Sequence, residues 1–228
     1  MGIRKNQKAL TNDEWSRLID AIDKTHGVGA ASPAYRDFVK VHVQAMSMPG
    51  MSWGVHTMMG VPGRNFLAWH RWFIRQFEKT LQKIDASVSL PYWDAITDRQ
   101  IPQALDNPVL LTKWSISRSW NPSVLPTSAD LASVVGTGTF VVFQAAIEGA
   151  VHGGVHNAVG GDMKGISSPA DPLFWLHHAN IDRTWSKWQV THVGQDPANL
   201  TEKLKPTPIF KVKVQDALNI ATLGYSYQ

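Results

Sequence analysis

Two adjacent histidines, His177 and His178, lie inside the strongly apolar stretch DPLFWLHHANIDRTW at residues 171–185. Burying an imidazole costs free energy unless its nitrogens find partners, so a fold that encloses this stretch must supply them. Apolar residues recur around it at helical spacing, which predicts a helix over residues 172–190. The two histidines are therefore either hydrogen-bonded core residues or ligands of a bound group.

Three further segments have the period of an amphipathic helix. Residues 11–24 begin with the capping box Thr-x-x-Glu, and a Gly-Val-Gly run at 27–29 is expected to end that helix. A second helix should begin with Pro33 at its first helical position and reach about residue 46. Residues 66–84 place apolar and aromatic side chains on one stripe and predict a third helix.

The remaining segments give weaker signals. Residues 97–138 are rich in Pro, Asn, Ser and Thr and predict a long connection of turns and short pieces. Residues 140–156 mix strand-like and helical patterns, and residues 209–214 alternate like a half-exposed strand. We expect one domain over residues 1–228, without a C-terminal lid domain. It should be a mainly α fold, an antiparallel helical bundle with long loops and a few short strands.

Composition excludes some functions and leaves others open. The formal charge is +4, but Lys and Arg are spread along the chain, so we expect no nucleic-acid partner. No window of about 18 apolar residues exists, and the N-terminus does not resemble a signal peptide, so we expect no membrane partner. Localisation stays unknown, with the cytoplasm as the default expectation. The chain has no cysteine, so a metal would need nitrogen or oxygen ligands.

The histidines point to a metal site. His42, His70 and His178 each fall on the inner face of a predicted helix, and His152 and His156 lie one helical turn apart. One histidine on an apolar face is more often a satisfied core residue than a ligand. Several facing histidines would leave many buried nitrogens without partners, and bundles often resolve this by binding metal. Histidine ligands alone suit Cu, Zn, Fe or Ni.

Five motifs extend this observation: FLAWHRWF at 66–73, LPYWD at 90–94, HGGVH at 152–156, DPLFWLHHANIDRTWSKWQ at 171–189 and LGYSY at 223–227. Together they resemble the tyrosinase, catechol oxidase and haemocyanin family of type 3 binuclear copper proteins, in the order that this family has. The resemblance implies two copper ions as cofactor, dioxygen as co-substrate and small phenols as substrates. The implied reaction is oxidation of ortho-diphenols to ortho-quinones, with ortho-hydroxylation of monophenols.

The resemblance also assigns residues. It implies that the first copper is bound by His42, His56 and His70, and the second by His152, His156 and His178. His177 is then expected to be a hydrogen-bonded core residue. His26 and His192, near predicted helix C-termini, are interpreted as structural.

Around these ligands the resemblance implies further roles. Glu148 matches the glutamate that orients a water for deprotonating a monophenol; bridging within the bundle is the alternative. Gly153 stands where the family usually has an asparagine, which argues against efficient monophenol hydroxylation, although Asn157 offers a partial substitute. Met163 and Ile166 are candidates for the mouth of the site, or else ordinary loop residues.

Asp182 is spaced to accept the second ring proton of His178; pairing with Arg183 or a neighbouring helix is equally open. Two other functions remain open for the whole chain. One is a haemocyanin-like dioxygen-binding protein, and the other is a structural or zinc-dependent hydrolytic bundle. The oligomeric state is left open.

Overall fold

The computed structural model describes residues 1–27 and 33–228. Its α-helices are α1 (Asn12–His26), α2 (Tyr35–Ala45), α3 (Met48–Met51), α4 (Phe66–Ile84), α5 (Pro108–Lys113), α6 (Ser128–Val135), α7 (Phe140–Ala146), α8 (Gly154–Val159) and α9 (Leu173–Thr191). A π-helical segment, η4 (Ile147–Gly153), joins α7 to α8. Short 3-10 turns are η1 (Gln7–Ala9), η2 (Gln103–Leu105), η3 (Pro122–Val124), η5 (Gly161–Lys164), η6 (Ser168–Ala170) and η7 (Val214–Ala217). The expected mainly α fold with long loops and few strands is confirmed.

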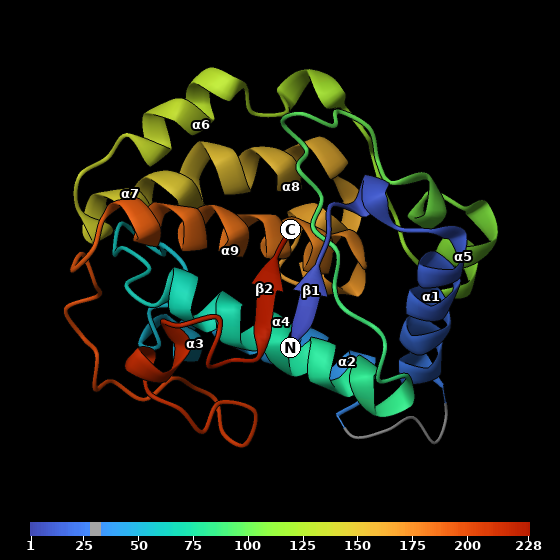
Figure 1. Cartoon of the computed structure of the whole chain (residues 1–228), viewed down its shortest axis with the longest axis horizontal. Helices are drawn as coiled ribbons and strands as arrows, with labels where there is room; N and C mark the ends of the chain where they lie inside the picture. The colour runs from blue at the N-terminus through green and yellow to red at the C-terminus, as the bar shows by residue number, and fades with distance from the viewer. Residues whose placement is uncertain (28–32) are drawn as a thin grey trace.

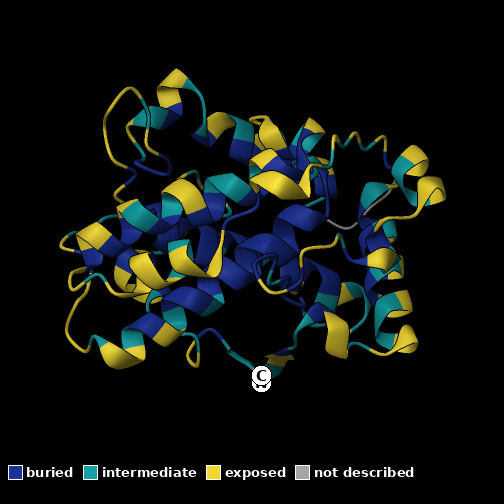
Figure 2. Ribbon diagram, turned by 90° about the horizontal axis from the view of Figure 1, so that it is seen from above, coloured by how far each residue is buried: buried dark blue, intermediate teal, exposed yellow. Residues whose placement is uncertain are grey.

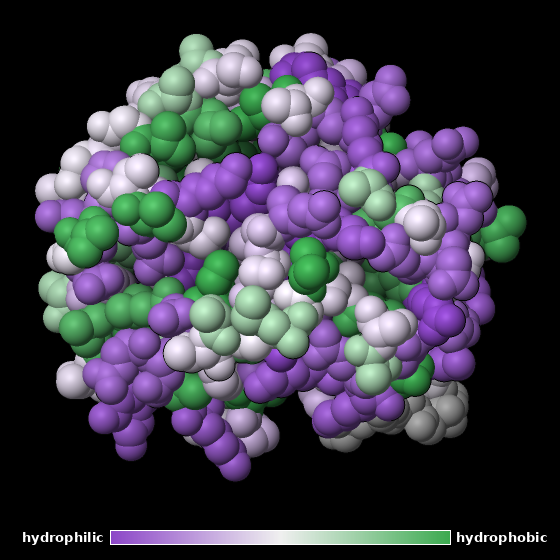
Figure 3. Space-filling model, viewed as in Figure 1, coloured by the Kyte–Doolittle hydropathy of each residue, from purple (hydrophilic) through white to green (hydrophobic). Residues whose placement is uncertain are grey.

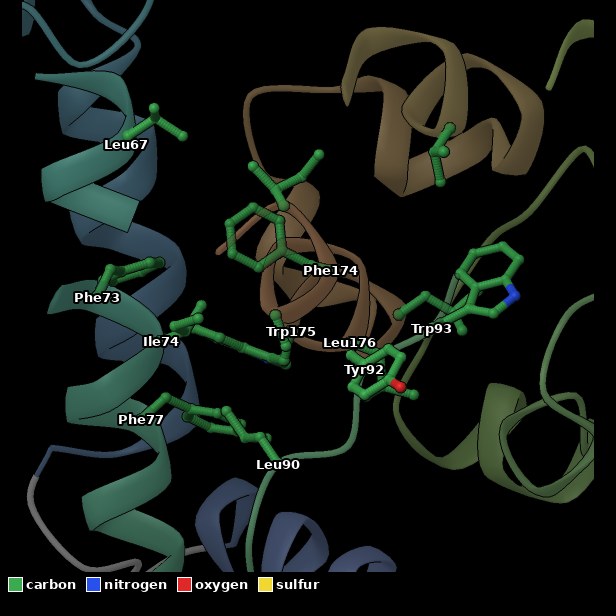
Figure 4. Packing of buried hydrophobic residues seen from close by; sticks show 14 of the residues in the cluster. Leu67, Phe73, Ile74, Phe77, Leu90, Tyr92, Trp93, Phe174, Trp175 and Leu176 are labelled. Atoms are coloured by element: carbon green, nitrogen blue, oxygen red, sulfur yellow. The ribbon is translucent and has the colours of Figure 1, made fainter. Parts of the chain in front are cut away.

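The two longest helices, α4 and α9, pack together at the centre of the molecule. Aromatic side chains fill the space between them, and the rings of Phe77 and Trp175 are stacked with centroids 3.9 Å apart. Figure 4 shows Phe73, Ile74 and Phe77 of α4 facing Phe174 and Trp175 of α9. Both helices lie largely buried, with exposed residues at the periphery (Figure 2). Large aromatic residues bury much apolar area each, which explains why these two helices form the core.

The ends of the predicted helices are largely as expected. The capping box at Thr11 and Glu14 is formed, and α1 ends at His26 with Gly27 as its cap; Val28 and Gly29, expected to end it, lie outside the described residues. Pro33 is not at the first helical position as predicted, because α2 begins at Tyr35 with Ala34 as its N-cap.

Two expectations about extended structure were wrong or incomplete. Residues 209–214 form no strand: only an isolated bridge between Lys203 and Lys213 is present, and Phe210 instead stacks on Trp69 with ring centroids 4.7 Å apart. The alternation there reflects buried and exposed side chains on a loop that has no partner strand. Residues 140–156, with their mixed pattern, are helical except at Gly149, where a ψ of −111° kinks the helix.

The two chain ends pair as a parallel ribbon that the sequence did not predict. β1 (Gly2–Arg4) lies beside β2 (Tyr225–Tyr227) in front of α4 and α9 (Figure 1), with Arg4 opposite Tyr227. The fully buried Arg4 guanidinium donates to Glu78 of α4 at 2.8 and 3.1 Å and to Asp182 of α9 at 3.2 Å. The ribbon thereby fastens both ends of the chain to the central helix pair.

Among the described residues, no helix has the length and apolar character needed to cross a bilayer. On the face viewed in Figure 3, hydrophobic side chains are scattered among hydrophilic ones.

Candidate metal centre

Six histidines from separate segments form two triads. His42, His56 and His70 make the first triad, and His152, His156 and His178 make the second. Within each triad, one ring nitrogen per residue lies within 4.8 Å of the other two. The structure thus brings together all six histidines that the resemblance implied.

The helical core positions these rings. His42 lies on α2, His70 on α4 and His178 on α9, all facing the interior with at most 2% exposure. His152 closes the π-helical segment and His156 lies one turn later on α8, which leaves their ring centroids 4.5 Å apart. His56 comes from the loop after α3 and is 9% exposed.

Backbone carbonyls fix four of the rings through Nδ1. His42 donates to the carbonyl of Ile166 at 2.7 Å, and His156 to that of Met163 at 2.5 Å. His70 and His152 donate to the carbonyls four residues earlier in their own helices, at 2.8 and 3.0 Å. A carbonyl only accepts, so Nδ1 carries the proton and Nε2 of each of these rings carries a lone pair.

The free Nε2 atoms fit a metal ion. In each triad one pair of Nε2 atoms is 3.3 Å apart, namely His42 with His56 and His156 with His178. Nε2 of His70 and of His152 is buried without a hydrogen-bond partner in the part of the chain that the structure describes. Buried lone pairs that converge in this way are explained by a cation between them, as in histidine-bound metal sites.

Burial keeps these imidazoles neutral. It lowers the pKa of His42, His70, His152 and His178 well below 6.5, and neighbouring imidazoles lower each pKa further. Burial also lowers the pKa of His156 to about 4. Only a neutral imidazole has a lone pair for a metal, so five of the six rings are ready to bind one near neutral pH.

The two triads adjoin and share two aromatic walls. The rings of His70 and His178 are stacked, with centroids 4.3 Å apart and planes 16° apart. Phe66 contacts rings of both triads, including His56 at 5.6 Å and His152 at 4.8 Å. Phe174 also contacts both, with its centroid 5.3 Å from that of His42 and 4.0 Å from that of His178. The arrangement is one centre with two metal positions in apolar surroundings.

The expected bond between Asp182 and His178 is absent, so that prediction was wrong. The Asp182 carboxylate accepts from Arg71 of α4, from Arg4 and from the hydroxyls of Tyr225 and Tyr227 at 2.7 and 2.6 Å. Those donors occupy it fully, and Nδ1 of His178 has no hydrogen-bond partner among the described residues. The alternative, pairing with a neighbouring helix, is correct, with Arg71 as the partner.

Glu148 lies beside the first triad although it precedes the second one in sequence. Its Oε1 is 3.6 Å from Nδ1 of His56, and its carboxylate accepts from the Thr57 backbone N–H at 2.6 Å and the Thr57 hydroxyl at 3.0 Å. The side chain is 10% exposed. Glu148 therefore holds the loop that carries His56.

The other predicted site residues are placed as follows. Gly153 is in helical conformation beside His152, and an added Cβ would meet nothing closer than the Glu148 carbonyl at 3.8 Å. Asn157 is exposed. The Met163 side chain is 1% exposed while that of Ile166 is 50% exposed, so only Ile166 of the pair reaches the surface.

The three remaining histidines are structural, as expected. His177 is buried, its Nε2 donates to the carbonyl of His152 at 3.2 Å, and its ring is stacked on that of His152. His26 and His192 donate through Nδ1 to carbonyls at the C-terminal ends of α1 and α9, each at 3.0 Å.

Sequence reasoning missed the carbonyl acceptors. The loop that follows α8 supplies one carbonyl to each triad, from Met163 and from Ile166, and Thr57 anchors Glu148. Every residue has a backbone carbonyl, so no pattern of residue types in the sequence could have identified these acceptors.

Two cavities among the described residues have no histidine in their walls. A groove of about 620 Å³ is lined by β1, Arg75 and residues 86–89. A cavity of about 220 Å³ has Glu148 and Gly63 in its wall, together with apolar residues of α7 and residues 197–198. Glu148 thus lines the smaller cavity and also lies 3.6 Å from Nδ1 of His56.

Comparison with known proteins identifies the family. The Tyrosinase family model, the common central domain of tyrosinase, matches residues 32–129 and 112–191. The tyrosinase of Streptomyces glaucescens is 33% identical, with 90% of this chain and 92% of that protein covered, and the tyrosinase of Streptomyces lincolnensis is 34% identical with the same coverage. A functional unit of Octopus hemocyanin has a TM-score of 0.78 at 25% identity, covering 100% of this chain and 68% of that one. The chain belongs to the tyrosinase family.

Proposed function

We propose that this protein is an oxidoreductase that uses dioxygen to oxidise ortho-diphenols to ortho-quinones. Family membership implies a binuclear copper centre, and the two histidine triads, with five of the six side chains buried, are the residues that would hold it, one copper ion each. The converging Nε2 lone pairs carry this proposal, because imidazole is a preferred copper ligand and the site offers no carboxylate or thiolate among its six ligands. Curated relatives named tyrosinase, about a third identical over most of the chain, support it.

When bound, the copper pair would accept two electrons from the diphenol and pass them to dioxygen. The chain's own residues hold that pair in place: carbonyls of two loop residues and of two helices fix the tautomer of four rings, so that each presents Nε2. Phe66 and Phe174 exclude bulk water from these nitrogens. A dry site strengthens the interaction of the ligands with charge at the metal positions.

Glu148 is the proposed proton acceptor. An ortho-diphenol releases two protons as it loses two electrons, and a monophenol must lose its hydroxyl proton before the ring is hydroxylated. The Thr57 N–H and O–H hold the Glu148 carboxylate beside His56, within reach of a water at the first triad. Monophenol hydroxylation is proposed as the weaker activity, because Gly153 has no side-chain amide to hold that water.

Reversible dioxygen binding without turnover is the second candidate. The similarity to the Octopus hemocyanin functional unit, which covers this entire chain, favours it. The two candidates share the copper centre and differ in whether a phenol reaches it and is oxidised.

The test is oxygen uptake by the copper-loaded protein in the presence of a catechol. We expect dioxygen consumption together with quinone absorbance. Zinc-loaded protein is the matched control, since zinc suits the same ligands and has no redox chemistry. Turnover no faster with copper than with zinc contradicts the proposed oxidation, and dioxygen uptake without quinone favours the second candidate.

A further inference from the structure

Five of the chain's seven methionines lie within 14 residues, at positions 46, 48, 51, 58 and 59; the other two are Met1 and Met163. This methionine segment, residues 46–59, follows His42 and contains His56, so it connects two histidines of the first triad. It includes α3 and packs against the end of α2 (Figure 1). Thioether sulfur is a soft ligand that selects Cu(I) over Cu(II) and Zn(II).

The segment runs from solvent to the buried triad. Met59 is 79% exposed and Met48 is 64% exposed. Met46, Met51 and Met58 are half-buried. His56, two residues from Met58, is buried but is the most exposed member of its triad. Thioethers thus occur at the surface and at intermediate depth, and one of them is two residues along the chain from a histidine of the centre.

One of these methionines is held outward by an unfavourable backbone conformation. Met58 and Val61 exchange two backbone hydrogen bonds, of 3.0 and 2.9 Å, around a two-residue turn. In that turn Met59 has φ +50° and Gly60 has φ +79°. The first position of such a turn is normally Asn, Asp or Gly, and the left-handed φ is unfavourable for an ordinary side chain such as that of methionine. A strained residue whose side chain lies in solvent gains nothing from packing, which points to a role for the side chain itself.

A copper ion must lose its water to reach the first triad. The triad rings are at most 9% exposed and contact Phe66 and Phe174, so an ion bound to their Nε2 atoms is largely withdrawn from bulk water. Moving a bare ion into such surroundings is costly unless ligands replace the water along the way. Thioether sulfurs at successive depths would supply ligands that replace this water, and they would do so for Cu(I) but not for Cu(II).

We propose that the methionine segment captures Cu(I) at the surface and passes it to the first triad through His56. This inference rests on the proposed copper function of the triads, and it adds a transient Cu(I) site that is separate from the six histidines. Met48 and Met59 would take the ion from solvent, and Met51 and Met58 would carry it inward.

The test compares a variant with Met48, Met51, Met58 and Met59 all changed to Leu with the wild type. Leucine keeps size and apolar character, so the fold should persist. Val61→Leu, an exposed apolar change in the same turn, is the matched control. Copper-free protein is mixed anaerobically with Cu(I) held by a coloured chelator, and separately with a Cu(II) salt, and the rate of copper transfer is followed.

We expect Cu(I) uptake to slow about tenfold in the methionine variant, with Cu(II) uptake and the final copper content unchanged. Equal Cu(I) rates in the variant and the wild type, or equal slowing for both ions, would overturn the proposal.

A second measurement does not depend on the variant: X-ray absorption of wild-type protein given Cu(I) beyond two equivalents should show sulfur ligands. Absence of sulfur from that spectrum also overturns it. Failure of catechol oxidation alone, with these results intact, would count against the proposed function and not against Cu(I) capture.

Discussion

Gly153, next to His152, is the residue whose substitution should change the ratio of monophenol to diphenol turnover. There is room for a side chain, because an added Cβ meets nothing closer than 3.8 Å and the backbone is helical. We expect Gly153→Asn to raise the ratio of monophenol to diphenol turnover, since its amide can hold a water near Glu148. Steady-state rates on a matched pair of phenol and catechol measure this. Gly153→Ala is the control, and an equal rise in both variants would refute the water argument.

The adjacent histidines have different tasks and should respond differently to substitution. Nε2 of His178 faces His156 in the second triad, whereas Nε2 of His177 donates to a carbonyl. We expect His178→Ala to bind one copper per chain in place of two. His177→Ala should keep two and lose about 2 kcal/mol of unfolding free energy from its buried hydrogen bond and packing. Metal analysis and denaturant unfolding separate the two, and loss of copper from His177→Ala alone would reverse the assignment.

Single residues also mark where sequence reasoning succeeded and failed. His42, His70 and His178 could be placed because helical periodicity fixes which face a residue occupies. Asp182 could not, since its partners come from elsewhere in the chain: Arg71 lies on α4, and Arg4 lies on a strand 178 residues away. Spacing within a helix carries no information about partners from elsewhere in the chain.

The loop after α8 is the element that links the two triads. Its carbonyls at Met163 and Ile166 anchor His156 and His42 respectively. Gly161 in this loop has φ +51°, and an added Cβ would lie 2.0 Å from the Ser117 carbonyl oxygen. Only glycine fits there, because the conformation and the space both exclude a side chain.

We expect Gly161→Ala to shift this loop and weaken copper retention at both triads. The matched control is Gly165→Ala, whose added Cβ would meet only ordinary contacts, the nearest at 3.5 Å. Copper loss to a chelator, followed over time, should be faster for Gly161→Ala and unchanged for Gly165→Ala. Faster loss from one triad only would show that the loop does not couple them.

Helices were predictable as elements and strands were not. The bounds of α4 and α9 follow from long aromatic stripes, which bury area along the whole helix. The pairing of β1 with β2 joins three residues at each end of the chain, and such short, distant segments have no local pattern. The false strand at 209–214 arose because alternating burial occurs on a packed loop as well as on a strand.

The molecule as a whole should lose stability in acid when it carries no metal. Burial lowers the folded-state pKa of five of the triad histidines, to about 4 for His156, while a histidine of the unfolded chain titrates near 6.5. Below pH 6.5 the unfolded state therefore binds more protons, and the unfolding free energy falls as pH drops toward 4. Metal-loaded protein should resist this change, since bound imidazole cannot take up a proton.

Denaturant unfolding at pH 7, 6 and 5, with and without metal, measures this dependence. The buried carboxylate of Asp182 contributes separately, at lower pH. Burial alone would raise the pKa of Asp182, but the charges of Arg71 and Arg4 lower it below its usual value. The stabilisation from this carboxylate is therefore lost only as the pH falls through that lowered pKa. Equal pH dependence of the metal-free and metal-loaded protein between pH 7 and 5 would contradict the neutral, converging triads.

We propose that the two triads form one binuclear copper centre that binds dioxygen and oxidises catechols. The most direct measurement loads the protein with copper, reduces it, admits dioxygen and records the near-ultraviolet spectrum before and after adding a catechol. We predict two coppers per chain, an intense band that appears with dioxygen, and its loss with quinone formation when catechol is added. Full copper occupancy without any band on adding dioxygen would contradict the account.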